Sequence, residues 1–114
     1  MQRDDAALLD IAQACKLISS FVRSMTKEDF LEDFKTQSSV QYQIIIIGEA
    51  VKRLSPGIRK RHSEIPWTQI TGMRDVVIHG YDIVDWDETW DTATKDVPEL
   101  LAKIEPLLPT ESQD

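Results

Sequence analysis

Apolar residues recur at three- and four-residue intervals along most of this chain, and this spacing decides its class of fold. Between Asp5 and Met25 the apolar positions are Leu8, Ile11, Cys15, Ile18, Val22 and Met25. Such spacing places apolar side chains on one face of a long amphipathic helix. No window alternates apolar and polar residues over enough positions to indicate a strand. The sequence therefore predicts an all-α fold.

Two further helices are predicted after Met25. Thr26, with Asp29 three residues later, resembles a capping box. It opens a short helix that presents the apolar side chains Phe30, Leu31 and Phe34. Ser38 or Ser39 can then cap a third helix, over residues 40–54. Because Ile45 and Ile46 widen the apolar surface of this helix beyond one stripe, we expect it to be buried centrally or at a subunit interface.

The second half of the chain also predicts helices. Pro66 is placed as the first residue of a helix that Gly80 ends. Asp85 or Asp87 can cap a last helix, which Pro98 should bend. We therefore predict an antiparallel bundle of four to five helices.

Length and composition bound the organisation of the chain. Its 114 residues suit one domain, 1–114, with a flexible tail over 109–114. The aliphatic run 44–47 is far too short to span a bilayer, so a cytoplasmic location without membrane association is the default expectation. The single cysteine, Cys15, excludes an internal disulfide and a multi-cysteine zinc site, and its place on an apolar stripe indicates a buried thiol.

Charge is unevenly distributed along the sequence. The net charge of −7 argues against indiscriminate nucleic-acid binding, which depends on clustered Lys and Arg. Positive charge nevertheless gathers at Lys52-Arg53 and at 59–62, while carboxylates crowd residues 28–33 and 82–99. A local basic surface on an acidic protein is compatible with this pattern, although most such clusters are simply solvated faces.

The segment from Met73 to Tyr81 carries the chemistry. Arg74 supplies a planar, permanently charged donor array suited to phosphate, and His79 can accept and donate a proton near pH 7. Asp75 lies four residues before His79, so on a helix it could reach and orient the imidazole. The alternative is that both residues are purely structural. Arg74 would then form a surface salt bridge, and His79 would interact with a helix dipole.

The spacing of this pair also points to a second copy of the chain. On an ideal helix, residues five apart differ by roughly 140° in direction, so Arg74 and His79 would not share a face. They could meet one phosphate if the helix ends irregularly at Gly80, or if a symmetric dimer brings two such pairs together.

The sequence resembles the HEPN superfamily, and within it the HepT-like toxins of HEPN/MNT toxin–antitoxin pairs. The resemblance spans about residues 5–107, and its motifs occur in the family's order and spacing. They are Ile46-Ile47-Gly48-Glu49-Ala50-Val51-Lys52-Arg53-Leu54, Ile65-Pro66-Trp67, Gly72-Met73-Arg74-Asp75 with His79-Gly80-Tyr81, and Asp85 with Trp90-Asp91-Thr92.

The resemblance implies the toxin of a type VII system. It implies a helical homodimer with an endoribonuclease site where the two motifs face each other. This site would be metal-independent and would use no other cofactor. His79 would be the general base, Arg74 would brace the phosphorane and Asp75 would support them. It also implies a partner, an MNT-type nucleotidyltransferase antitoxin that silences the toxin by attaching AMP to Tyr81.

The sequence departs from the family at three positions. Tyr42 stands where arginine is common, Ile45 where glutamate is common, and Asp82 where an aromatic residue is common. The altered central helix and the acidic balance favour an alternative function, a non-catalytic module that binds a nucleotidyltransferase or nucleotide. A third alternative is an oligomerising bundle, in which Arg74 and His79 would tolerate alanine.

Overall fold

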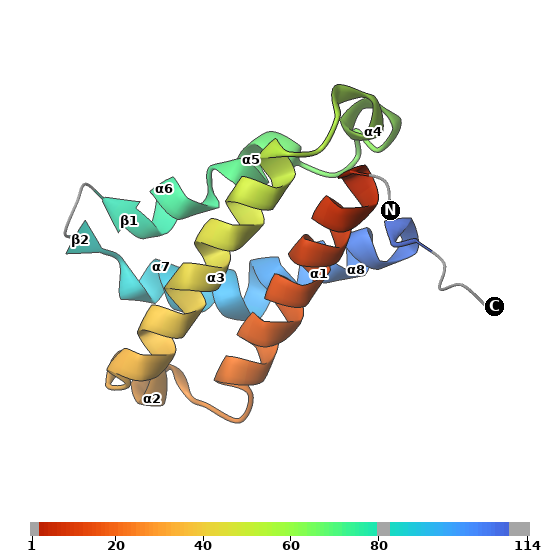
Figure 1. Ribbon diagram of the computed structural model, residues 1–114. Helices are drawn as coiled ribbons and strands as arrows, with labels where there is room; N and C mark the ends of the chain where they lie inside the picture. The colour runs from red at the N-terminus through yellow and green to blue at the C-terminus, as the bar shows by residue number, and fades with distance from the viewer. Residues whose placement is uncertain (1–2, 80–82, 110–114) are drawn as a thin grey trace.

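The structure is a computed structural model that describes residues 3–79 and 83–109. Its helices are α1 (Arg3–Val22), α2 (Lys27–Leu31), α3 (Phe34–Lys52), α4 (Pro56–Arg61), α5 (Trp67–Thr71), α6 (Met73–Val77), α7 (Trp86–Asp91) and α8 (Val97–Ile104). A π-helical turn (Thr92–Asp96), a 3₁₀ turn (Glu105–Leu107) and the short strands β1 (Ile78–His79) and β2 (Ile83–Val84) complete the description (Figure 1). The predicted all-α helical fold is confirmed.

The core is built around α1 and α3, which lie side by side, while α8 packs against α1 (Figure 1). The apolar positions that define the first predicted helix are buried, except for the half-buried Met25 beyond the end of α1. Those buried are Leu8, Ile11, Cys15, Ile18 and Val22. Burial raises the pKa of the Cys15 thiol to about 12, so this residue is the structural thiol that its apolar stripe predicts.

The connection from α2 to α3 corrects one predicted boundary. The Thr26 and Asp29 capping box is confirmed, with both reciprocal hydrogen bonds present. However, α3 begins at Phe34 rather than near residue 40, because the Asp33 carboxylate accepts the backbone N–H of Thr36 at 3.1 Å. The predicted caps Ser38 and Ser39 are therefore wrong, and both lie inside α3.

Gly48 lets the backbone of α5 approach the middle of α3. A Cβ atom at this position would lie 3.6 Å from the carbonyl oxygen of Thr71, which is ordinary van der Waals contact with backbone. A larger side chain would have to displace the end of α5. The end of α5 therefore packs directly against the central helix α3.

The helix predicted from Pro66 to Gly80 is wrong in three respects. Pro66 precedes the first helical residue, the helix divides at Gly72 into α5 and α6, and α6 ends at Val77. The β-branched residues around position 77 favour extended backbone. The N–H of Asp85 also donates to the carbonyl of Val77 at 2.6 Å, which ties the end of α6 to the start of α7.

A short antiparallel pair follows α6 in place of the predicted irregular connection. Ile78 pairs with Val84, and His79 pairs with Ile83. The residues between these strands, 80–82, and the tail 110–114 lie outside the described residues. The flexibility predicted for 109–114 is therefore not tested.

The last helix is less simple than predicted. Asp85, rather than Asp87, caps α7, and its carboxylate accepts the N–H of Glu88 at 3.0 Å. The predicted bend at Pro98 takes the form of a π turn, in which the N–H of Val97 donates to the carbonyl of Thr92. Pro98 has no N–H and its ring crowds the preceding turn, so a wider turn there accommodates it.

No helix within residues 3–79 and 83–109 is long and apolar enough to cross a membrane.

Candidate active site

Two structural elements position the Arg74 and His79 motif. Arg74 is the second residue of α6, and His79 is the second residue of β1. Val77 and Ile78, which join the two, are buried and anchor this segment in the core. The irregular end that the sequence required is present, although it comes at Val77 and not at Gly80. The 140° separation of an ideal helix therefore does not apply to this pair.

The guanidinium of Arg74 is accessible. Its side chain is 54% exposed, and Nη1 donates to Oδ1 of Asp75 at 3.3 Å. Asp75 is 80% exposed, so this ion pair is solvent-screened and contributes little stability. The guanidinium therefore retains donors that a phosphate could accept from.

The helical argument for a contact between Asp75 and His79 does not hold in the structure. The i, i+4 geometry that would bring its carboxylate to His79 requires a helix through residue 79, and α6 ends two residues earlier. Its carboxylate instead contacts Arg74. The predicted helical basis for an Asp75 to His79 contact is therefore wrong, and Asp75 is placed to orient the arginine.

Two predicted positions lie outside the described residues. They are Tyr81, the predicted modification site, and Asp82. His79 is described here only by its backbone pairing with Ile83. On α3, Tyr42 is 60% exposed and Ile45 is half-buried, so the two departures on the central helix differ in accessibility.

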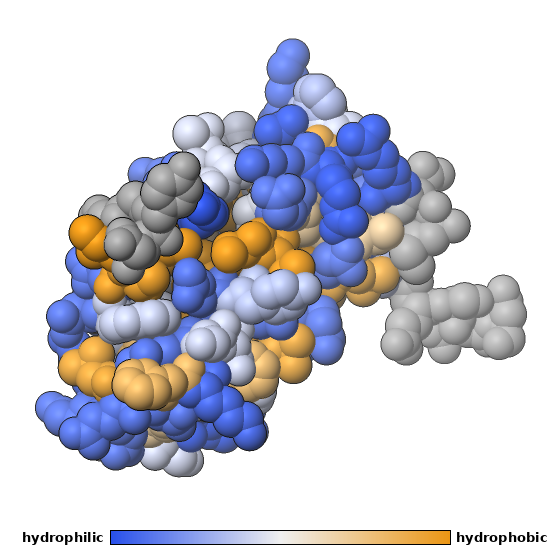
Figure 2. Space-filling view, turned by 60° about the vertical axis from the view of Figure 1, so that its left-hand side comes forward, coloured by the Kyte–Doolittle hydropathy of each residue, from blue (hydrophilic) through white to orange (hydrophobic). Residues whose placement is uncertain are grey.

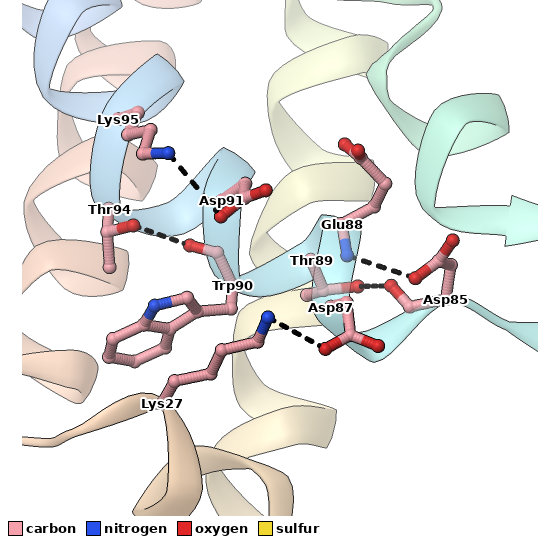
Figure 3. A network of polar contacts seen from close by, with 9 residues as sticks. All are labelled: Lys27, Asp85, Asp87, Glu88, Thr89, Trp90, Asp91, Thr94 and Lys95. Carbon is pink, nitrogen blue, oxygen red and sulfur yellow. Dashed lines mark hydrogen bonds and ion pairs between the residues drawn. The ribbon is translucent and has the colours of Figure 1, made fainter.

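A polar network fixes α7, which follows the hairpin (Figure 3). Asp85 accepts hydrogen bonds from the N–H of Glu88 to its carboxylate and from the hydroxyl and N–H of Thr89 to its carbonyl, at 2.8 and 2.9 Å. The ammonium of Lys27 lies 2.9 Å from the carboxylate of Asp87 and joins α2 to α7. The hydrogen bond to Asp87 raises the pKa of Lys27. Sequence reasoning missed this bridge, because nothing in the local pattern relates residues so far apart.

A pocket of about 430 Å³ lies beside α6 and was also not predicted. Met73 and Val76 of α6 form one wall, and Leu100 of α8 faces them with Asp96. Burial raises the pKa of Asp96, and the nearby carboxylates of Glu99 and Asp91 raise it further. The pocket combines residues from two separate segments, so no local sequence motif predicts it.

Within 3–79 and 83–109, no group of three or more His, Cys, Asp or Glu side chains is arranged to hold a metal ion.

Comparison with known proteins identifies the family. A sequence profile described as "Ribonuclease HepT-like" matches residues 11–107. The chain belongs to this HepT-like family. It is 45% identical over 100 residues to the protein named "Probable ribonuclease HepT" of Thermococcus cleftensis, covering 88% of this chain and 91% of that protein.

Other members of the HepT-like family are similar over the same extent. A protein of Caldanaerobacter subterraneus subsp. tengcongensis named "Putative RNase" is 38% identical over 101 residues, covering 89% of this chain and 90% of that protein. A protein of Methanocaldococcus jannaschii named "Gamma-glutamylcyclotransferase and putative RNase" is 35% identical to this chain, and the match covers 47% of that longer protein. No solved structure matches the chain.

Proposed function

We propose that this chain is a metal-independent endoribonuclease, the toxin of a type VII HEPN/MNT toxin–antitoxin pair. The observation that carries the proposal is the accessible guanidinium of Arg74, five residues from His79 across the end of α6, in a chain of the HepT-like family. A charged phosphate binder beside a group that titrates near neutral pH is the minimum needed to cut RNA without metal.

In the proposed reaction, His79 removes the proton from the 2′-hydroxyl of the RNA. The resulting oxygen attacks the adjacent phosphorus, and the bond from phosphorus to the 5′-oxygen breaks. A general acid, either water or the histidine of a second subunit, gives a proton to that 5′-oxygen. The products are a 2′,3′-cyclic phosphate and a 5′-hydroxyl. Positioned acid–base groups of this kind typically contribute about 10²–10⁴ in rate.

Arg74 supplies the electrostatic part of the mechanism. Its guanidinium stabilises the negative charge that grows on the phosphorane oxygens, and one of its nitrogens, Nη1, donates to the Asp75 carboxylate. Asp75 is therefore a positioning residue that acts through Arg74.

A homodimer would complete the site. Two apolar side chains are exposed in the single chain, Val76 within the motif at 49% and Ile83 just after it at 62%. On the face that carries the hairpin, apolar atoms lie in patches at the surface (Figure 2). Exposed apolar surface of this kind favours protein contact. A two-fold axis through this face would bring two Arg74 and His79 pairs together.

The antitoxin would act at Tyr81. An MNT-type nucleotidyltransferase would transfer AMP to the tyrosine hydroxyl, two residues after His79. The added nucleotide would fill the RNA site and place negative charge beside Arg74.

A second candidate is a binding module without activity. The net charge of −7 and the aliphatic Ile45 on α3 favour it, since neither assists contact with RNA. It predicts the same dimer and the same antitoxin, with no cleavage.

Cleavage of cellular RNA in excess EDTA distinguishes the two. The protein is first shown by intact mass to carry no nucleotide on Tyr81, and a folded His79→Ala variant serves as the control. The ribonuclease proposal predicts cutting by the parent chain and loss of cutting in the variant. Intact RNA with the unmodified protein would contradict the ribonuclease proposal and favour the binding module. Equal cutting by both proteins would indicate a contaminating nuclease.

A further inference from the structure

The charge of this protein is segregated around α4. Residues 49–64 contain five cationic and two anionic side chains and have a net charge of +3. The rest of the chain has a net charge of −10, which gives the total of −7. The cationic side chains are Lys52, Arg53, Arg59, Lys60 and Arg61. The basic cluster noted in the sequence therefore forms the cationic end of an otherwise acidic chain.

Helix α4 is held firmly from both sides. At its start, Ser55 donates its N–H and its hydroxyl to the carboxylate of Asp4, at 2.8 and 2.7 Å. At its end, Nε1 of Trp67 lies 3.2 Å from the carbonyl of Arg59 and 3.1 Å from that of His62, and donates to both. Ile58 is buried beneath the helix. Lys60 and Arg61 thus project from a fixed backbone, while Arg59 is half-buried.

The cationic side chains of α4 form no ion pair with the described carboxylates, although Asp4 is near: hydrogen bonds from Ser55 lower the pKa of its carboxyl, and the charge of Arg61 lowers it further. Lys52 pairs with Glu49, and Arg53 pairs with Asp10. By contrast, no carboxylate among the described residues lies within 4.0 Å of the cationic groups of Arg59, Lys60 or Arg61. Lys60 and Arg61 are also exposed. Exposed cations on a rigid turn are suited to phosphate oxygens.

The position of α4 relates it to the candidate active site. Helices α4, α5 and α6 follow one another along the same edge of the molecule (Figure 1). A strand of RNA with one phosphate at Arg74 could therefore continue past α5 to α4.

We propose that Arg59, Lys60 and Arg61, here called the α4 basic surface, bind the phosphate backbone of the RNA substrate away from the cleaved bond. This inference rests on the proposed ribonuclease function. The surface would supply affinity without reading sequence, because phosphate contacts carry no base information. It also explains how a chain of net charge −7 holds a polyanion, since residues 49–64 contain only two of its 20 acidic residues and α4 itself contains none.

The test compares the salt dependence of RNA binding in two variants with equal charge loss. Lys60→Ala with Arg61→Ala removes two members of the α4 basic surface. Lys16→Ala with Lys35→Ala removes two exposed lysines from α1 and α3. Both are made in a His79→Ala background, are checked for folding by circular dichroism, and are titrated with a single-stranded RNA of mixed sequence.

The plot of log K against log salt concentration has a negative slope. We expect this slope to become shallower by about 1.4 in the α4 variant, at about 0.7 for each phosphate that the protein no longer neutralises. In the control variant the slope should stay unchanged. Equal slopes in the two variants would overturn the inference.

Cleavage of a dinucleoside monophosphate by chains that retain His79 separates this inference from the proposed function. Such a substrate is too short to reach α4, so the α4 variant should cut it as fast as the parent does. A marked loss of that activity in the α4 variant would contradict a role in backbone binding alone. Failure of the parent to cut would count against the ribonuclease proposal, while the binding slopes would still decide whether α4 holds RNA.

Discussion

Replacement of Arg74 by alanine is expected to lower kcat for RNA cleavage by about 10²–10³, which is typical for removing one preorganised donor to a transition-state oxyanion. The side chain is exposed and its ion pair with Asp75 is solvent-screened, so the substitution should leave the fold intact. Single-turnover cleavage with saturating protein measures the effect on chemistry separately from RNA binding.

Two further variants sharpen this measurement. Arg74→Lys keeps the charge and loses the planar pair of donors, so its rate should lie between those of the parent and the alanine variant. Arg23→Ala removes an exposed arginine just beyond α1 and should have no effect on kcat. If Arg74→Ala behaves like Arg23→Ala, Arg74 has no place in the reaction.

Replacement of Phe30 by alanine is expected to lower the free energy of unfolding by about 3–5 kcal/mol, as for other large aromatic side chains removed from a core. Phe30 is fully buried, and its ring centroid lies 5.4 Å from that of Trp90 and 6.3 Å from that of Trp86. This contact joins α2 to α7, next to the Lys27 and Asp87 bridge.

Phe34 provides a matched control for that substitution. It is the same residue type four positions later and is 79% exposed, so Phe34→Ala should change the free energy of unfolding by no more than about 0.5 kcal/mol. Urea denaturation followed by circular dichroism measures both. Similar losses in the two variants would show that the aromatic cluster at α2 and α7 is not the stabilising contact described here.

The sequence predicted the features that depend on local pattern. The spacing of apolar residues identified α1 and its buried face, and the Thr26 and Asp29 capping box was found because both of its hydrogen bonds form within one turn.

The features that failed depend on contacts between distant segments. The spacing after Pro66 matches one helix, but a hydrogen bond from Asp85 and the burial of Val77 end α6 early. A sequence pattern contains no information on that bond. The same error removes the helical basis of the predicted contact between Asp75 and His79, because that contact was inferred from a helix that does not extend to residue 79.

The sequence predicted which residue types form the candidate site, but it did not predict how they are arranged. Arg74 and His79 were chosen for the chemistry of their side chains, and that choice does not depend on secondary structure. The pocket beside α6 and the Lys27 to Asp87 bridge were not predicted, because each combines residues from separate segments.

The proposed mechanism is tested most directly by an RNA that carries one 2′-deoxynucleotide immediately before a mapped cleavage position, incubated with the parent chain in excess EDTA. Attack by the 2′-hydroxyl predicts that this bond alone becomes resistant, while the all-RNA substrate is cut there to leave a 2′,3′-cyclic phosphate and a 5′-hydroxyl. Cleavage at the deoxy position, or products ending in a 3′-hydroxyl and a 5′-phosphate, would contradict the mechanism assigned to Arg74 and His79.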